Sequence, residues 1–254
     1  MRSLHLLFNR VRGRDTILEL EFQGQAFRLI VTAHREVRRA RELVHETALI
    51  ERIREIIRPG DTLYDVGANI GLISLLTALH PSGASARMHC FEPEPRNCAH
   101  LRRNLELNGL SERVQAHALA LGAEKGEAVL HVRGAEGEGR HSIATARGSS
   151  GSIRVPLTTA DEFAHAVGEP PDIVKIDVEG AEGQVLSGMR NLLRSGKPQE
   201  LLLEIHSKGD SDRMPEGGTI DDWLGSHGYV LAWRHGRRSG EHRHYRLPNS
   251  SRES

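Results

Sequence analysis

Short apolar runs alternate with helical patterns along most of the chain, and this alternation constrains the fold more than any other feature of the sequence. Runs typical of strands lie at Thr62 to Val66, Arg87 to Phe91, Arg113 to Ala118, Ile173 to Asp177, Glu200 to Ile205, Gly228 to Trp233 and His242 to Leu247. Helical patterns lie between them, at Leu72 to Leu79, Arg96 to Asn108, Glu182 to Arg194 and Ile220 to His227. This alternation predicts a doubly wound, mostly parallel α/β sheet that helices cover on both faces.

The first 60 residues precede this alternation and have patterns of their own. Residues 16–32 alternate apolar and polar side chains around a turn at residues 23–25, which predicts a hairpin. Apolar side chains then recur at helical spacing from about His34 to Arg58, where a Pro-Gly pair ends the pattern. We therefore expect an accessory hairpin with one or two helices at residues 1–60, followed by the main domain at residues 61–254.

Between Gly122 and Ser152 the alternation breaks. A hairpin-like stretch around Ala128 to Val132 leads into a segment rich in Gly, Ser, Glu and Arg. Because core strands follow this segment, we interpret Gly134 to Gly151 as a mobile loop over the site rather than as a linker.

Composition and charge narrow the class of protein. Lys plus Arg and Asp plus Glu both number 34, so the net charge is zero and no nucleic-acid partner is expected. We interpret the segment from Arg234 to Arg246, where three histidines are interleaved, as a solvated basic edge. No apolar run is long enough to span a bilayer, and the apolar start lacks a signal-peptide cleavage site. The two cysteines are interpreted as reduced thiols, which favours a cytoplasmic enzyme.

The sharpest motif is the run from Tyr64 to Gly71, YDVGANIG, which joins the first core strand to a helix. Gly67 and Gly71 allow a tight turn and a close approach of backbone to a ligand. A dinucleotide fingerprint would need a glycine where Asn69 stands, and Asp65 would repel a pyrophosphate. Asp65 instead suits the positively charged amino group of a methionine moiety. The alternative is an ordinary turn whose glycines serve packing only.

A second motif, Phe-Glu-Pro-Glu-Pro, closes the next predicted strand. Its Glu92 follows Asp65 by 27 residues, near the spacing of about 20 residues expected for a carboxylate that accepts hydrogen bonds from a ribose. Pro93 would present a flat apolar surface beside the nucleoside. Taken alone, Glu92 could be an ordinary solvated carboxylate. Taken together with the glycine turn, Glu92 predicts a nucleoside site.

Charged side chains end the fourth predicted strand. Apolar residues mark a buried strand from Ile173 to Val178, and strand alternation places Lys175, Asp177 and Glu179 on one side. Ligands of open α/β sheets bind outside the carboxyl ends of the strands, so Asp177 and Glu179 should point into the site. An internal ion pair of Lys175 with a carboxylate is the alternative interpretation.

The next strand ends in the same manner, with Glu204 and His206. His206 is the side chain best suited to take a proton near neutral pH, although a histidine at a strand end can also be non-catalytic. Together, Asp177, Glu179, Glu204 and His206 could instead hold a divalent metal ion. No spacing decides between these roles.

The ordered set of four motifs resembles the FkbM-type methyltransferase family. The resemblance covers about Glu46 to His206 and rests on the glycine turn, the Glu-Pro pair, the Lys-Ile-Asp-x-Glu-Gly-x-Glu strand end and the Glu-x-His strand end. It implies a class I, Rossmann-like sheet of seven strands with an antiparallel last strand, in a three-layer sandwich. It also implies S-adenosyl-L-methionine as cofactor, bound by Asp65, Gly67, Ala68, Asn69, Gly71, Glu92, Pro93, Ala118 and Leu119.

The resemblance further implies O-methylation of a hydroxyl on a small molecule, sugar or glycan. The sulfonium methyl is already activated, so the enzyme must align the acceptor oxygen and remove its proton. We expect Asp177 or His206 to be the base, with Lys175 and Glu179 orienting the base or the acceptor. The alternatives are an NAD(P)-dependent oxidoreductase, a nucleic-acid methyltransferase and a binding module without chemistry. Asn69 argues against the oxidoreductase, because a dinucleotide fingerprint needs glycine there. The balanced charge argues against a nucleic-acid acceptor. The charged strand ends argue against a module without chemistry.

Overall fold

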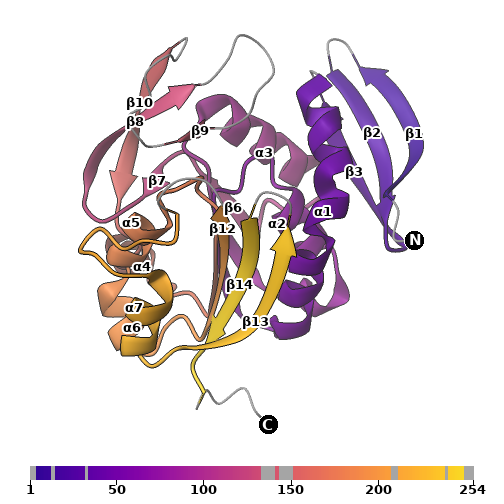
Figure 1. Cartoon of the computed structure of the whole chain (residues 1–254). Helices are drawn as coiled ribbons and strands as arrows, with labels where there is room; N and C mark the ends of the chain where they lie inside the picture. The colour runs from indigo at the N-terminus through magenta and orange to yellow at the C-terminus, as the bar shows by residue number, and fades with distance from the viewer. Residues whose placement is uncertain are drawn as a thin grey trace.

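The computed structural model describes residues 4–12, 15–31, 34–132, 141–142, 151–206, 211–237 and 240–248. A seven-stranded sheet with the order β13-β14-β12-β11-β4-β5-β6 lies at its centre (Figure 1). The parallel strands are β4 (Thr62–Val66), β5 (Arg87–Phe91), β6 (Val114–His117), β11 (Ile173–Ile176) and β12 (Glu200–His206). The last strand, β14 (Gly240–Arg246), is antiparallel to both β12 and β13 (Val230–Arg237). The expected seven strands with an antiparallel last strand are confirmed.

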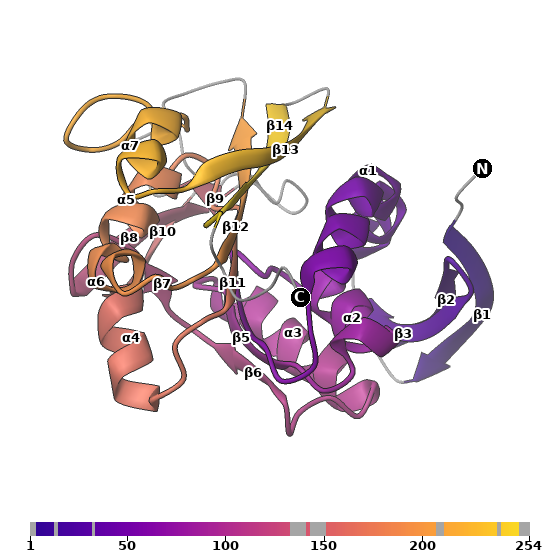
Figure 2. The same ribbon diagram turned by 90° about the horizontal axis from the view of Figure 1, so that it is seen from below.

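Helices cover both faces of this sheet, as Figures 1 and 2 show. One face carries α1 (His34–Ile56), α2 (Leu72–Ala78) and α3 (Pro95–Leu107), with a short 3₁₀ helix (Pro81–Gly83) after α2. The other carries α4 (Ala160–Val167), α5 (Glu182–Ser187), α6 (Arg190–Arg194) and α7 (Ile220–Ser226). Successive side chains of a strand point to opposite faces of the sheet. On β4, Leu63 packs on the face covered by α1, α2 and α3, and Tyr64 packs on the opposite face. The three-layer sandwich is thus confirmed.

The single helical pattern predicted over Glu182 to Arg194 is wrong in one respect. The segment forms two helices that break at Gly188 and Met189. A Cβ on Gly188 would lie 2.0 Å from the carbonyl oxygen of Gly122, so a neighbouring backbone passes directly against the break. Apolar side chains are buried on both sides of the break, which is why the periodicity does not reveal it.

The predicted N-terminal hairpin belongs to a three-stranded antiparallel sheet of β1 (Leu4–Arg12), β2 (Asp15–Phe22) and β3 (Gln25–Val31). Two asparagines of α3 attach β3 to the core. The Asn104 side chain accepts a hydrogen bond from Ile30 N at 2.9 Å, and the Asn108 side chain accepts one from Arg28 N at 2.9 Å. Asn104 Nδ2 also donates to the carbonyl oxygen of Ile70 at 3.0 Å, so it joins this sheet to the glycine turn.

A second small sheet lies beside the core, with the order β7-β10-β8-β9. Its strands are β7 (Ala120–Leu121), β8 (Gly126–Val132), β9 (His141–Ser142) and β10 (Ser152–Thr158). The expected hairpin-like stretch at 128–132 forms part of β8. The predicted loop from Gly134 to Gly151 lies outside the described residues, apart from β9 and Gly151. Within the parts of the chain that the structure describes, no helix has the length and apolar composition needed to cross a membrane.

Candidate active site

The turn that follows β4 passes through left-handed backbone conformations. Gly67, Asn69 and Gly71 have φ angles of 81°, 56° and 87°. A Cβ on Gly67 would lie 1.8 Å from the carbonyl oxygen of Asp177, and one on Gly71 would lie 2.3 Å from Leu101 Cδ1. At Gly67 a backbone oxygen occupies the space of a side chain, and at Gly71 the left-handed φ favours glycine.

Glu92 lies just after β5 and joins two turns at the carboxyl edge of the sheet. Its side chain is 5% exposed. One oxygen, Oε2, accepts a hydrogen bond from Asn69 N at 2.8 Å, and Oε1 accepts one from Glu94 N at 3.0 Å. Asn97 Nδ2 also donates to Oε1 at 3.5 Å, so several donors hold this carboxylate beside the glycine turn. Half-buried Pro93, Ala118 and Leu119 follow β5 and β6 at the same edge.

Beneath the glycine turn lies a buried ion pair. Lys175 Nζ is 2.9 Å from Asp65 Oδ1, and these side chains are 2% and 0% exposed. Ser74 Oγ donates to Asp65 Oδ2 at 2.5 Å, and Lys175 also donates to the carbonyl oxygen of Gly67 at 3.1 Å. Burial acts to lower the pKa of Lys175, but Asp65 and Asp177 together raise it above its ordinary value. The ion pair weighed as an alternative for Lys175 is therefore present, and it supports the turn from below.

Asp177 and His206 meet at the rim, as the sequence predicted from the ends of neighbouring strands. His206 Nε2 lies 3.6 Å from Asp177 Oδ1, and the side chains are 16% and 28% exposed. The approach of Asp177 raises the pKa of His206 to about 9, although burial opposes this shift. Burial likewise opposes the ionised form of Asp177, but Lys175 and His206 hold the pKa of Asp177 well below its ordinary value. At neutral pH the pair is an imidazolium and a carboxylate.

The segment after β11 departs from the predicted strand alternation. β11 ends at Ile176, and Glu179 has a φ of 55°, so the alternation that placed Glu179 beside Asp177 does not reach it. Glu182, which the sequence analysis did not single out as a site residue, is fully buried below this turn. Its Oε1 accepts a hydrogen bond from Gly180 N at 3.1 Å, and burial raises its pKa to about 7. Its only sequence signal is its place in the same motif.

The interpretation of Arg234 to Arg246 as a solvated edge is wrong for β14. Strand β13 forms the edge of the sheet, and β14 lies inside it. His242 and His244 are therefore 0% exposed and Arg243 is 6% exposed. Arg243 pairs with Asp212 and with Asp221 of α7. The exposed His235 on β13 does fit the interpretation.

Among the described residues, two groups of side chains lie close enough together to hold a metal ion: Asp177 with Glu204 and His206, and Glu46 with Glu204 and His242. The first group contains three of the four ligands that the sequence suggested, without Glu179. In the second group the Arg237 guanidinium already contacts both carboxylates and supplies positive charge between them.

Comparisons with known proteins bear on the family of this chain. The model of the methyltransferase FkbM domain matches residues 65–231. Hexuronic acid methyltransferase AglP of Haloferax volcanii is 30% identical over 195 residues, which cover 75% of this chain and 74% of AglP. The 2-O-methyltransferase NoeI of Sinorhizobium fredii is 25% identical, covering 65% of this chain and 74% of NoeI.

A solved structure shows the same fold. The crystal structure of methyltransferase FkbM from Methylobacillus flagellatus superposes with a TM-score of 0.52 at 17% identity. The match covers 79% of this chain and 51% of that one. Because the domain model also spans more than half of the sequence, the protein belongs to the FkbM methyltransferase family and is, as its motifs predicted, an S-adenosylmethionine-dependent methyltransferase.

Proposed function

We propose that the protein transfers the methyl group of S-adenosylmethionine to a hydroxyl oxygen of a small molecule, sugar or glycan. The observation that carries this proposal is the contact between two parts of the site. Gly67 packs against the Asp177 backbone, so the cofactor turn and the Asp177–His206 pair share one edge of the sheet. The relatives named as a 2-O-methyltransferase and as a hexuronic acid methyltransferase favour an oxygen acceptor on a sugar-like molecule.

The residues around the glycine turn fit the cofactor. The Glu92 carboxylate lies next to Asn69 and is the group we assign to the ribose hydroxyls, and Pro93, Ala118 and Leu119 offer apolar surface at the adjoining strand ends. Asp65 is enclosed by Lys175 and Ser74, so in place of the expected contact with the cofactor's amino group we assign it to fixing the turn from within. When bound, S-adenosylmethionine supplies a methyl group that its sulfonium already activates.

The Asp177–His206 pair removes the proton of the acceptor hydroxyl. The acceptor oxygen forms its new bond to the methyl group and loses its proton, and S-adenosylhomocysteine is the second product. Neutral His206 takes this proton at Nε2, and the Asp177 carboxylate stabilises the imidazolium that forms. Because the pKa of His206 is about 9 before the acceptor binds, this assignment predicts a rate that rises with pH up to about that value. Proton transfer to Asp177 instead would give a rate that is flat above neutral pH.

The test uses isotope-labelled S-adenosylmethionine with a panel of hydroxylated acceptors, followed by mass spectrometry of the products. Once an acceptor is found, Asp177→Asn and His206→Gln should each lower kcat by roughly 10²–10⁴ while the cofactor Kd changes little. His235→Ala is the matched control, since His235 is an exposed histidine on β13. Label appearing only on nitrogen or carbon atoms, or full turnover in both variants, would refute the proposal.

A metal-assisted version of the same reaction is the second candidate. It is favoured by the convergence of Asp177, Glu204 and His206 within 4.8 Å. Here activity would disappear with a chelator and return on adding a divalent ion. The oxidoreductase alternative has no support from the family match, and titration with NADH should give no binding.

A further inference from the structure

We infer that Glu46, in the accessory helix α1, is a positioning residue of the active site that acts through Arg237 and Glu204 on His206. The chain of contacts from Glu46 through Arg237 and Glu204 to His206 is called the Glu46 link below. Its effect on catalysis rests on the proposed function. The link itself consists of contacts among α1, β12, β13 and β14.

Glu204 is the central member of the link. Its side chain is 6% exposed, and its Oε1 lies 3.7 Å from His206 Nδ1. The other ring nitrogen of His206 faces Asp177, so the imidazole is held between two carboxylates. Because Glu204 faces Nδ1, the place of its carboxylate influences both the orientation of the ring and which nitrogen carries a proton.

Arg237 fixes the carboxylate of Glu204. Its Nη1 contacts Glu204 Oε1 at 2.5 Å, and its Nη2 contacts Glu46 Oε1 at 2.5 Å. The same Nη1 donates to His242 Nε2 at 3.0 Å. A guanidinium is a planar fork whose two arms are rigidly related, so the carboxylate on one arm sets where the other arm points.

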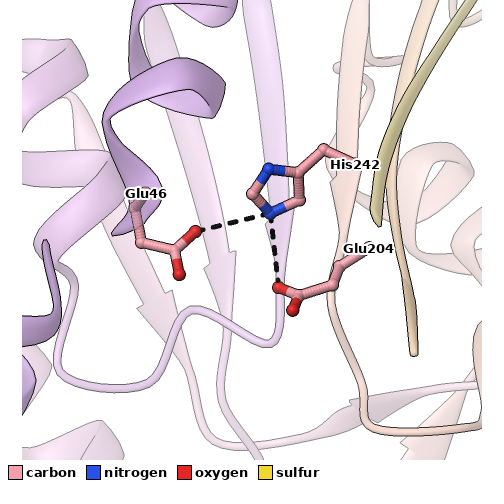
Figure 3. Close-up of side chains that lie close together, drawn as sticks. All are labelled: Glu46, Glu204 and His242. Carbon is pink, nitrogen blue, oxygen red and sulfur yellow. Dashed lines mark ion pairs between the residues drawn. The ribbon is translucent and has the colours of Figure 1, made fainter. Parts of the chain in front are cut away.

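Figure 3 shows the part of this cluster in which Glu46 and Glu204 both face the His242 ring. His242 Nε2 is 3.5 Å from Glu46 Oε2 and 3.5 Å from Glu204 Oε2, and its ring is 0% exposed. Each carboxylate thus uses Oε1 for Arg237 and turns Oε2 toward the same histidine. Of these three side chains, Glu46 is the most exposed, at 21%.

Helix α1 is well placed to act as a fixed support. Further along the same helix, Arg52 Nε donates to His244 Nδ1 at 3.0 Å. The other ring nitrogen of His244 lies 2.7 Å from Glu200 Oε2 on β12. Two polar links therefore join α1 to β12 and β14, and they hold Glu46 at one position along the sheet.

Without the Glu46 carboxylate, Arg237 would keep a single anionic partner. Both arms of the guanidinium could then turn to Glu204 and draw its Oε1 away from His206 Nδ1. Among the described residues, the charged groups that act on His206 are Asp177, Glu179, Glu204 and Glu182. Of these, Glu204 is the one whose position depends on Glu46 through a shared partner.

The experiment compares Glu46→Ala with Glu46→Gln in the full chain. Glu46→Ala should lower kcat by roughly 10- to 100-fold, as expected for a misplaced reacting group, with the cofactor Kd within about twofold of the parent. It should also move the imidazole ¹⁵N resonances of His206, assigned by their loss in His206→Gln, at fixed neutral pH. Glu46→Gln keeps an oxygen acceptor for Arg237 and should retain most of the turnover. Glu55→Ala on the same helix removes an exposed partner of Arg52 and should change neither readout.

Two results would overturn the inference: unchanged His206 resonances in folded Glu46→Ala, or full turnover in that variant. The resonances need no turnover, so failure of the link is distinguishable from failure of the proposed reaction. Moved resonances without O-methylation would keep the link and reject the reaction. Should Glu46→Ala not fold, Arg237→Lys keeps the charge, loses the fork and must move the same resonances. In a double-mutant cycle, Glu46→Ala should add little to the effect of Arg237→Ala.

Discussion

Replacing Lys175 with methionine should destabilise the protein by about 3–5 kcal/mol, the cost expected for breaking a buried ion pair from one side. The reason is the enclosure of Asp65, which is 0% exposed and lies 2.9 Å from the lysine nitrogen. The substitution would leave a buried carboxylate with the Ser74 hydroxyl as its donor and would deprive the Gly67 carbonyl of the lysine donor. Methionine matches the lysine chain in length, so little of the loss would come from a cavity.

For a chain of this size, 1 kcal/mol corresponds to about 2–4 °C in Tm, so the loss predicts a fall of about 6–20 °C. Urea unfolding followed by circular dichroism should give a lower midpoint with an unchanged slope. The double variant Asp65→Asn with Lys175→Met contains no buried charge at this place and should recover most of the stability. An unchanged midpoint in Lys175→Met, or a double variant as unstable as the sum of both single variants, would refute this reasoning.

Three further predictions concern the cofactor turn and the rim. Glu92→Gln should weaken S-adenosylmethionine binding by about 1.5–3 kcal/mol, measured by calorimetry, because a charged acceptor is lost; an unchanged Kd would reject the ribose assignment. The pKa of His206 is raised from 6.5 to about 9, so its contribution to stability is complete below about 6.5 and disappears as pH rises through about 9. Urea unfolding at both limits should show a loss of at most about 3 kcal/mol that His206→Gln lacks. Gly67→Ala should abolish cofactor binding, because its Cβ would meet a backbone oxygen at 1.8 Å, whereas Gly168→Ala at φ 70° has open space and should cost only about 1 kcal/mol in thermal unfolding.

Where a local pattern coincides with a structural element, the sequence was sufficient to place it. The predicted strands at residues 62–66 and 87–91 match β4 and β5, because buried parallel strands are short apolar runs that a turn motif ends. Helix α4 was not anticipated, although Thr159 caps it and Gly168 ends it. Its apolar face is only two turns long, too short for periodicity to separate it from the loops around it.

Part of the candidate site could likewise be predicted from the sequence, and part could not. Asp177 and His206 could be brought together from sequence, because parallel strands end at one edge and each motif sits at a strand end. The partnership of Glu46 with Arg237 joins residues 191 positions apart. No local pattern predicts this contact, which exists only because the folded chain brings α1 beside the end of β13. Likewise, burial of β14 follows from its place inside the sheet, which its histidines and arginines did not suggest.

The asparagines of α3 also limit how this protein can assemble. β3 is one edge of the N-terminal sheet, and edge strands offer backbone groups to which another chain can add a strand. On β3 the amides of Arg28 and Ile30 are already bonded to Asn108 and Asn104, and Asn108 donates in turn to the Arg28 carbonyl. A second chain could pair there only by displacing both side chains, and displacing Asn104 would also release Ile70 in the cofactor turn. Self-association by strand addition at β3 is therefore opposed by the same side chain that supports the cofactor turn.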